Sequence, residues 1–183
     1  MGTTIDDAAG EAFDKLAKYL GLGYPGGPVI SRLAKEGNAN AIKFPRAMIK
    51  EDNFNFSLSG LKTAVINYVD EHKDDKDFNL PDLCASFEQA IIDVQVAKAR
   101  RALQETKSKS FLFGGGVAAN PSLREAYSEM CEEEGVEMIM APLTACGDNA
   151  AMIALVADER FTQNKFASLD TDVEAQASLD VEY

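Results

Sequence analysis

Hydrophobic side chains recur every three or four positions in six stretches of the chain, which is the spacing of one face of an α-helix. Glycine and proline mark several of the ends: Gly21 follows the first stretch, Pro28 opens the second and Pro81 opens the longest. Thr4 or Asp6 precedes the first stretch and is expected to cap its helix. The pattern predicts helices at about residues 9–20, 28–36, 61–69, 81–107, 121–134 and 152–156.

Three shorter stretches have the character of β-strands. Residues 111–113 are a brief aromatic-rich run closed by glycines, which predicts a buried strand. Residues 136–141 predict a second strand that ends at Pro142, and the alternation over 54–58 predicts a third. Because a helix separates the first two strands, they are expected to lie parallel with a right-handed crossover. The elements indicate an α/β fold, rich in helix, with a small and mainly parallel sheet.

Three consecutive glycines, 114–116, end the first strand, and Asn120 and Pro121 then form a typical helix start. Without β-carbons, the backbone N–H groups of such a turn can come close to a ligand, often a phosphate or a ribose. The glycines match neither G-x-x-x-x-G-K-[ST] nor G-x-G-x-x-G, and a tight turn without a ligand is the alternative. A second glycine pair, Gly26 and Gly27, also precedes a helix, and two such junctions favour a shared ligand.

Composition and charge limit the kinds of partner. The chain has 183 residues, 46% of them apolar and 26% charged, which fits a soluble globular domain or a large part of one. Its formal charge of −12 argues against tight binding of nucleic acid or an anionic membrane by this chain alone, because both need clustered Lys and Arg. No membrane span or signal pattern is expected. Three cysteines without C-x-x-C spacing predict reduced thiols in a cytoplasmic protein.

Four single side chains are candidates for chemistry. Asp148 follows the second strand at the sheet edge where ligands of open α/β sheets bind, so it is either a helix cap or a metal ligand. Asp14 lies near the polar boundary of its helix, where a solvated carboxylate is the alternative to a functional one. Lys62 lies in a first helical turn and is a candidate for binding a ligand or partner, although an ordinary surface lysine is favoured. His72 is the chain's one histidine, so it has no second histidine for a metal-binding pair.

Five sequence runs, in this order along the chain, resemble the tRNA adenosine threonylcarbamoyltransferase family, which also carries the label O-sialoglycoprotein endopeptidase or glycoprotease. The resemblance extends from about residue 2 to about residue 158, and the shared order of the runs argues against chance agreement. The runs are DDAAGEAFDK at 6–15, YPGGP at 24–28, FSLSGLKTA at 56–64, GGVAAN at 115–120 and DNAAMIA at 148–154.

The resemblance implies a truncated second lobe of an actin-like, Hsp70-like ATPase fold. In that family two lobes enclose a cleft that holds an ATP-derived substrate, threonylcarbamoyl-adenylate, and a metal described as iron or zinc. The threonylcarbamoyl group passes to the exocyclic amine of the adenosine beside the anticodon in certain tRNAs. By motif match, the adenylate contacts would be Asp14, Gly27 and Asn120, the lining on the nucleotide side would include Gly115 and Gly116, and the metal ligand would be Asp148.

The chain also departs from the family pattern. The family's H-x-x-x-H metal ligands and a Ser-Gly-Gly-His run that handles the adenylate lie upstream of every matched run, and this chain has neither. The match is therefore to roughly the C-terminal half. Because Asp148 alone cannot hold a catalytic metal, we expect the isolated chain to be inactive as a transferase, and no catalytic residue is assigned. Missing strands would leave a sheet edge exposed, which predicts self-association.

The predicted organisation is a C-terminal lobe over residues 1–163, followed by an acidic, loosely ordered tail over 164–183. The alternative function is a non-catalytic nucleotide-binding or scaffold module, because the family works with partner proteins, one of them of similar fold. A metallo-glycoprotease has no support, since neither H-E-x-x-H nor a nucleophile beside a histidine occurs. The acidic charge suggests that the tRNA contact lies mainly on the missing half or on partners.

Overall fold

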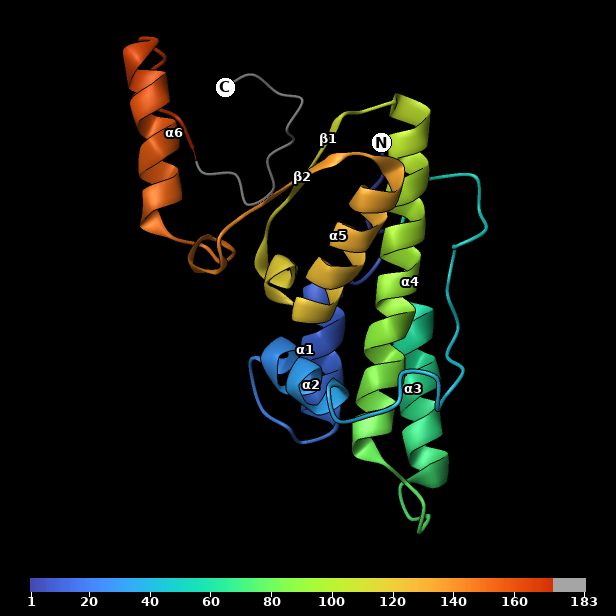
Figure 1. The fold of residues 1–183 in the computed structure, drawn as a ribbon. Helices are drawn as coiled ribbons and strands as arrows, with labels where there is room; N and C mark the ends of the chain where they lie inside the picture. Colours follow the sequence, from blue (N-terminus) through green and yellow to red (C-terminus); the bar gives the residue numbers. More distant parts are fainter. Residues whose placement is uncertain (173–183) are drawn as a thin grey trace. The chain divides into compact units, whose positions relative to one another are not determined.

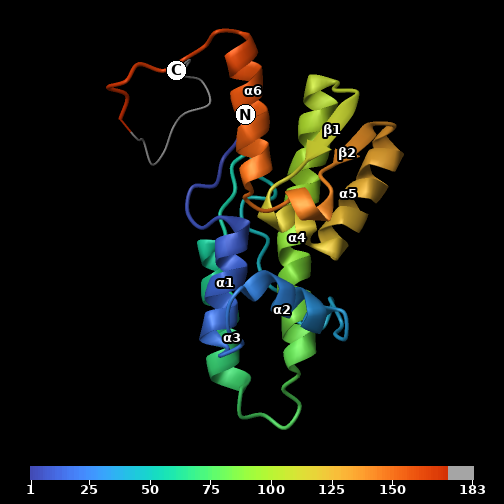
Figure 2. The same ribbon diagram turned by 90° about the vertical axis from the view of Figure 1, so that its left-hand side faces the viewer.

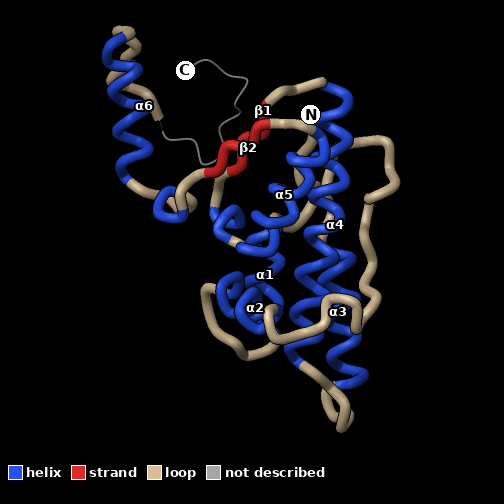
Figure 3. Tube along the Cα trace, in the orientation of Figure 1, coloured by secondary structure: helices blue, strands red, loops and turns tan. Residues whose placement is uncertain are grey.

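The computed structural model describes residues 1–172, which are rich in helix and contain two short strands (Figures 1 and 3). The chain divides into two compact units, residues 1–147 and the part that begins at Asp148. The elements are α1 (Ala9–Tyr19), α2 (Gly26–Ala34), α3 (Ser59–His72), α4 (Leu80–Thr106), β1 (Ser110–Phe113), the 3-10 helix η1 (Gly116–Ala119), α5 (Pro121–Glu134), β2 (Glu137–Met140), the 3-10 helix η2 (Leu143–Ala145) and α6 (Ala150–Thr162).

Helix α4 connects the two halves of the first unit. Its first half packs with α1, α2 and α3, and its second half packs with α5 and the strands (Figures 1 and 2). Phe13 of α1 meets Phe87 of α4 edge-on, with ring centroids 5.3 Å apart. In a second hydrophobic core, around the second half of α4, the ring of Tyr127 of α5 contacts the rings of Phe111 and Phe113, with centroids 4.9 and 4.7 Å apart. One long helix therefore fixes α2 and the start of α5 in the same unit.

Strands β1 and β2 form a parallel sheet in which Ser110 pairs with Glu137 and Phe113 with Met140. Helix α5 connects them, as the sequence pattern predicts. The helix-rich α/β class with a small parallel sheet is thereby confirmed, and it is consistent with a truncated lobe of an actin-like fold. The prediction of a buried first strand is wrong, because only its aromatic side faces α5. Leu112, on the opposite side of the strand, is 76% exposed.

The strand predicted at 54–58 does not form. Among the described residues, Phe56 makes a single parallel bridge to Thr4 rather than joining the sheet. The preceding backbone is held by α4 instead: Lys98, only 2% exposed, donates from Nζ to the carbonyl oxygen of Asn53 at 2.8 Å. Phe56 itself is joined to Thr3 and Ile5 by backbone hydrogen bonds. The segment is therefore fixed by contacts with distant residues, which the alternation of apolar and polar residues does not reveal.

The cap predicted for the first helix is also wrong. The N-cap residue of α1 is Ala8, rather than Thr4 or Asp6. The backbone N–H of Ala8 donates to the Glu11 carboxylate at 3.2 Å, as in a capping box. The Asp6 carboxylate instead accepts the backbone N–H of Leu58 at 2.8 Å, immediately before α3.

The second unit contains α6, which includes the predicted helical residues 152–156 and extends beyond them at both ends. Its N-cap is Asn149, whose side chain accepts the backbone N–H of Met152 at 3.0 Å. Residues 164–172 form turns without helix or strand. The rest of the predicted tail, 173–183, lies outside the described residues, so the division at 163 stays a prediction. Over the described part of the chain, every helix is too short or too polar to cross a membrane.

Candidate functional site

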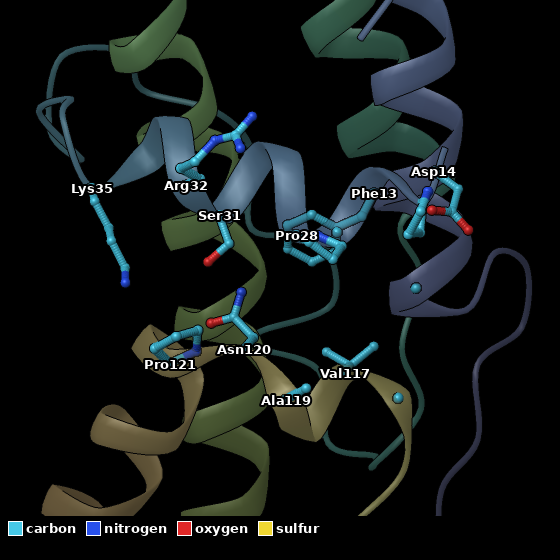
Figure 4. A pocket seen from close by; sticks show the side chains of 14 residues that line it. Phe13, Asp14, Pro28, Ser31, Arg32, Lys35, Val117, Ala119, Asn120 and Pro121 are labelled. Atoms are coloured by element: carbon cyan, nitrogen blue, oxygen red, sulfur yellow. The ribbon is translucent and has the colours of Figure 1, made fainter. Parts of the chain in front are cut away.

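A cavity of about 600 Å³ lies between α1 and α2 on one side and η1 with the start of α5 on the other (Figure 4). All of its lining residues belong to the first unit. Residues far apart in the sequence therefore meet around one space. Four of the six predicted site residues line it, namely Asp14, Gly27, Gly116 and Asn120.

Asp14 holds the start of α2 against α1. Its Oδ1 accepts the backbone N–H of Gly26 at 2.7 Å, so α2 begins at Gly26, two residues before the predicted Pro28. Gly26 cannot carry a side chain without movement, because a Cβ would lie 2.6 Å from the carbonyl oxygen of Phe13. A Cβ on Gly27 would meet nothing within 4 Å, and Gly27 borders the cavity. The close packing of α2 thus presents the Gly27 backbone to a ligand.

Asn120 is held from two sides. Its Oδ1 accepts the backbone N–H of Leu123 at 2.9 Å, which confirms the predicted N-cap of α5. Its Nδ2 donates to Oε1 of Glu88 at 2.5 Å. Glu88 lies on α4 and is 4% exposed. Both partners require the same orientation of the amide, because a backbone N–H needs an acceptor and a carboxylate needs a donor.

Ser31 brings an unpartnered hydroxyl to the cavity. It is 6% exposed, and within residues 1–172 its Oγ has no hydrogen-bond partner. Figure 4 shows this hydroxyl directed from α2 toward Asn120 on the opposite wall. Buried polar atoms in folded proteins nearly always have a partner. The position is therefore suited to a polar atom of a ligand.

The glycine turn differs in shape from the prediction. The 3-10 helix η1 lies between β1 and α5, so the strand does not pass directly into the helix. Gly115 has φ of 92°, a region that favours glycine. Gly116 borders the cavity, whereas Gly115 is not among the described lining residues. Arg124 of α5 fixes this path, since its guanidinium donates to the carbonyl oxygens of Ala118 and Ala141, the latter at 2.6 Å.

The cavity combines apolar walls with a few polar groups. Its apolar surface includes Phe13, Pro28 and Val117 (Figure 4). Two cations also line it, Arg32 of α2 and Lys35 directly after α2, although the chain as a whole is acidic. Among the described lining residues there is neither a cysteine nor a histidine. The arrangement can therefore bind and orient a ligand with a flat apolar part and polar edges, and it offers no paired nucleophile and base.

The cysteines do not change this conclusion. All three are free and buried, in line with the predicted reduced thiols. Burial, with a smaller contribution from the nearby Glu88 carboxylate, raises the pKa of the Cys84 thiol to about 12. A thiol with such a pKa stays protonated at neutral pH and is a poor nucleophile.

The remaining candidates belong to other parts of the chain. Asp148 is exposed and directly precedes the residue that caps α6, so the alternative of Asp148 as a helix cap is wrong. His72 ends α3 and pairs with Asp75 at 2.8 Å. Lys62 pairs with Asp7 at 2.8 Å. Over residues 1–172, no group of three His, Cys, Asp or Glu side chains is placed to hold a metal ion.

Glu88 and Ser31 are site residues that sequence patterns do not identify. Glu88 and the following Gln89 interrupt an apolar and small-residue stretch of α4, and a charge at such a position is the signal that could mark Glu88. Ser31 gives no comparable signal, because a serine on an amphipathic helix is compatible with either a buried or an exposed face.

Comparison with known proteins agrees with the family resemblance. The family model for tRNA N6-adenosine threonylcarbamoyltransferase matches residues 1–155. Curated proteins of that name include one from Geotalea uraniireducens, which is 48% identical over 94% of this chain and 50% of its own length. The protein of Clostridium botulinum strain 657 is 45% identical over 93% of this chain and 50% of its own length. The protein of Thermotoga neapolitana is 42% identical over 98% of this chain and 54% of its own length. The chain spans about half the length of these relatives. It belongs to the tRNA N6-adenosine threonylcarbamoyltransferase family.

Proposed function

We propose that this chain binds an adenosine nucleotide in the cavity and forms the adenylate-binding half of a tRNA N6-adenosine threonylcarbamoyltransferase. The observation that supports this most strongly is that Asp14, Gly27, Gly116 and Asn120, from separate elements of the fold, line one cavity. A volume of about 600 Å³ lies within the range of small-molecule sites.

The cavity offers separate surfaces for the parts of such a nucleotide. The apolar surface around Pro28 and Val117 suits a base, and the Ser31 hydroxyl and the Asn120 amide lie on facing walls where polar edges would be recognised. The Gly27 and Gly116 backbones leave room for close approach of a ribose. These groups bind and orient the adenylate in the proposal.

In the proposed reaction, the exocyclic amine of an adenosine in tRNA attacks the carbamoyl carbon of threonylcarbamoyl-adenylate. A C–N bond forms, the C–O bond to the adenylate phosphate breaks, AMP leaves, and the amine loses a proton. The cavity residues would hold the AMP portion so that the carbonyl is presented to the incoming amine. Their contribution is positioning of the donor substrate.

The described residues do not by themselves fit a complete metal centre. A catalytic iron or zinc needs about three protein ligands, and no such group occurs within residues 1–172. Asp148, an exposed carboxylate, is proposed as a single ligand. The other ligands would then come from outside this chain.

The partners belong to the proposal as well. The proposed macromolecular substrate is tRNA, and the proposed setting is the cytoplasm together with partner proteins of the modification pathway, one of them of similar fold. With a formal charge of −12, this chain supplies few of the cations that a tRNA surface needs. The main tRNA contact is therefore proposed to lie outside it.

A nucleotide-binding module without catalysis is the second candidate function. It is favoured by the cavity lining, which contains no cysteine or histidine among its described residues. Supplying the other half of a relative, such as the Geotalea uraniireducens protein, separates the two candidates. If the combined halves transfer the threonylcarbamoyl group to tRNA and Asn120→Ala abolishes this transfer, the chain is part of the enzyme. If the chain binds nucleotide but no transfer occurs, it is the non-catalytic module.

Calorimetric titration of the chain with AMP tests the proposal. The parent chain is expected to bind AMP, and Ser31→Ala is expected to bind it several-fold more weakly. The same change should leave the free chain at least as stable, because it removes a buried hydroxyl that has no partner. Ser128→Ala, a change in α5 away from the cavity lining, is the control. Absence of binding at millimolar AMP, or equal affinity in Ser31→Ala, would contradict the proposal.

A further inference from the structure

We infer that Glu88 is a positioning residue, which holds the side-chain amide of Asn120 so that one of its N–H bonds is available to a ligand in the cavity. The inference rests on the proposed function, because the ligand concerned is the nucleotide proposed for the same cavity. It adds a residue of α4 that does not itself border the cavity.

The side-chain amide of Asn120 makes two hydrogen bonds within the protein. Asn120 uses its oxygen to accept the Leu123 N–H at 2.9 Å and one hydrogen of its nitrogen to reach Glu88 at 2.5 Å. An amide nitrogen has two hydrogens, so one remains. Asn120 borders the cavity, and Figure 4 shows its nitrogen turned toward α2 across that space. The second N–H is thus placed as a donor to a ligand.

Glu88 determines this orientation because it is an ionisable acceptor in a buried place. It is 4% exposed, and none of the ion pairs among the described residues involves it. A buried carboxylate without a cation costs stability. It does, however, strongly disfavour the flipped amide, in which the Asn120 oxygen would face the carboxylate. The observed arrangement therefore favours one amide orientation over the other.

Ser31 supplies the independent observation that a ligand belongs here. Its hydroxyl is more than nine-tenths buried, has no partner within the described part of the chain and is directed toward Asn120. Two polar groups therefore face each other with unused hydrogen-bonding capacity, one from α2 and one from the start of α5. A ligand edge that carries acceptor atoms, such as that of a purine or a ribose, would engage both groups.

A pair of substitutions at Glu88 tests the inference with the full chain and AMP as the probe. Glu88→Gln keeps an acceptor and is expected to bind AMP within about threefold of the parent, whereas Glu88→Leu loses the acceptor and should bind about tenfold more weakly. Glu105→Gln removes a carboxylate of 52% exposure from the same helix and is the control for lost charge. Equal AMP affinity in Glu88→Leu and the parent would overturn the inference.

The side-chain NH₂ signals of Asn120 in NMR spectra of the ligand-free chain report on the contact itself. One of the two protons should exchange slowly in the parent and in Glu88→Gln, and rapidly in Glu88→Leu. Unchanged signals in Glu88→Leu would overturn the positioning role even when AMP binds. A parent chain that does not bind AMP would overturn the proposed function, and the NMR signals would still decide whether Glu88 orients the amide.

Exchanging the donor and the acceptor separates a ligand-directed role from a purely structural one. Asn120→Asp alone sets two carboxylates against each other and should destabilise the chain. Adding Glu88→Gln restores a donor to that contact and should recover stability. It should not recover AMP binding, because the cavity still lacks the Asn120 amide donor. Recovery of both properties in the double variant would refute the role assigned to that N–H.

Discussion

Adjacent glycines at the start of α2 should respond to the same substitution in opposite ways. Gly26→Ala introduces a Cβ 2.6 Å from both the Phe13 carbonyl oxygen and the Ala17 Cβ, and 2.8 Å from the Asp14 Cα. Gly27→Ala introduces a Cβ with nothing within 4 Å, at a residue that borders the cavity. The first change should therefore act on stability, and the second on nucleotide binding.

The magnitude follows from how far the helix would have to move. Ordinary van der Waals contact begins at 3.4 Å, so the Gly26→Ala Cβ falls about 0.8 Å short of it against backbone that cannot rotate away. Overpacking of this kind costs roughly 1–3 kcal/mol of the free energy of unfolding. Gly27→Ala should be at least as stable as the parent, because alanine favours helix over glycine and its Cβ meets nothing within 4 Å.

Urea denaturation followed by circular dichroism measures the first effect, and calorimetric titration with AMP measures the second. Gly26→Ala should lower the urea midpoint. Gly27→Ala should not lower the midpoint and should weaken AMP binding by at least several-fold, because the proposed ribose approaches the Gly27 backbone closely. The reasoning is refuted when Gly26→Ala is as stable as the parent, or when Gly27→Ala binds AMP with undiminished affinity.

Three further outcomes are expected. Burial opposes ionisation of Asp6, but hydrogen bonds from Ser57, the Leu58 N–H and Ser59 outweigh it and hold the pKa of Asp6 well below its usual value of 3.8. The ionised Asp6 carboxylate therefore stabilises the fold above pH 3.8, and this stabilisation is lost as the pH falls through the lowered pKa. The urea concentration at the unfolding midpoint should decrease when the pH is lowered below about 4, and it should decrease less steeply in Asp6→Asn. Parallel pH profiles of the two chains would contradict this. The chain should self-associate in sedimentation velocity experiments through its open two-stranded sheet, and Leu112→Lys should reduce the effect because Leu112 is 76% exposed; a parent that stays monomeric at high concentration would count against it. Elemental analysis of the purified chain should find no stoichiometric iron or zinc, because Asp148 provides one ligand only; one tightly held metal per chain would show that this view of the site is incomplete.

Local signals were sufficient to predict most of the helices. Apolar periodicity indicates α1, α3 and α4, and the Asn120–Pro121 pair marks the start of α5, where the structure shows the expected cap. These features depend on interactions within a few residues, which a sequence displays directly. The parallel pairing of β1 and β2 also follows from element order.

Features that depend on tertiary contacts could not be predicted in this way. The alternation at 54–58 favours a strand, yet Phe56 bonds to Thr3 and Ile5, and Asn53 just before the segment bonds to Lys98, far along the chain. The Glu88–Asn120 contact joins the first half of α4 to the start of α5, and no local pattern connects them. The cavity is lined by residues of α1, α2, η1 and α5, and the Asp14–Gly26 hydrogen bond that joins α2 to α1 spans twelve positions of the sequence.

The central claim is that distant residues of this chain form one nucleotide site, and NMR titration of the ¹⁵N-labelled chain with AMP tests it most directly. The account predicts that backbone signals of Gly27, Ser31, Gly116 and Asn120 shift together along one saturation curve. Gly60, which lies on α3 and does not border the cavity, should not shift. Shifts confined to other residues, or no shifts at millimolar AMP, would contradict the account.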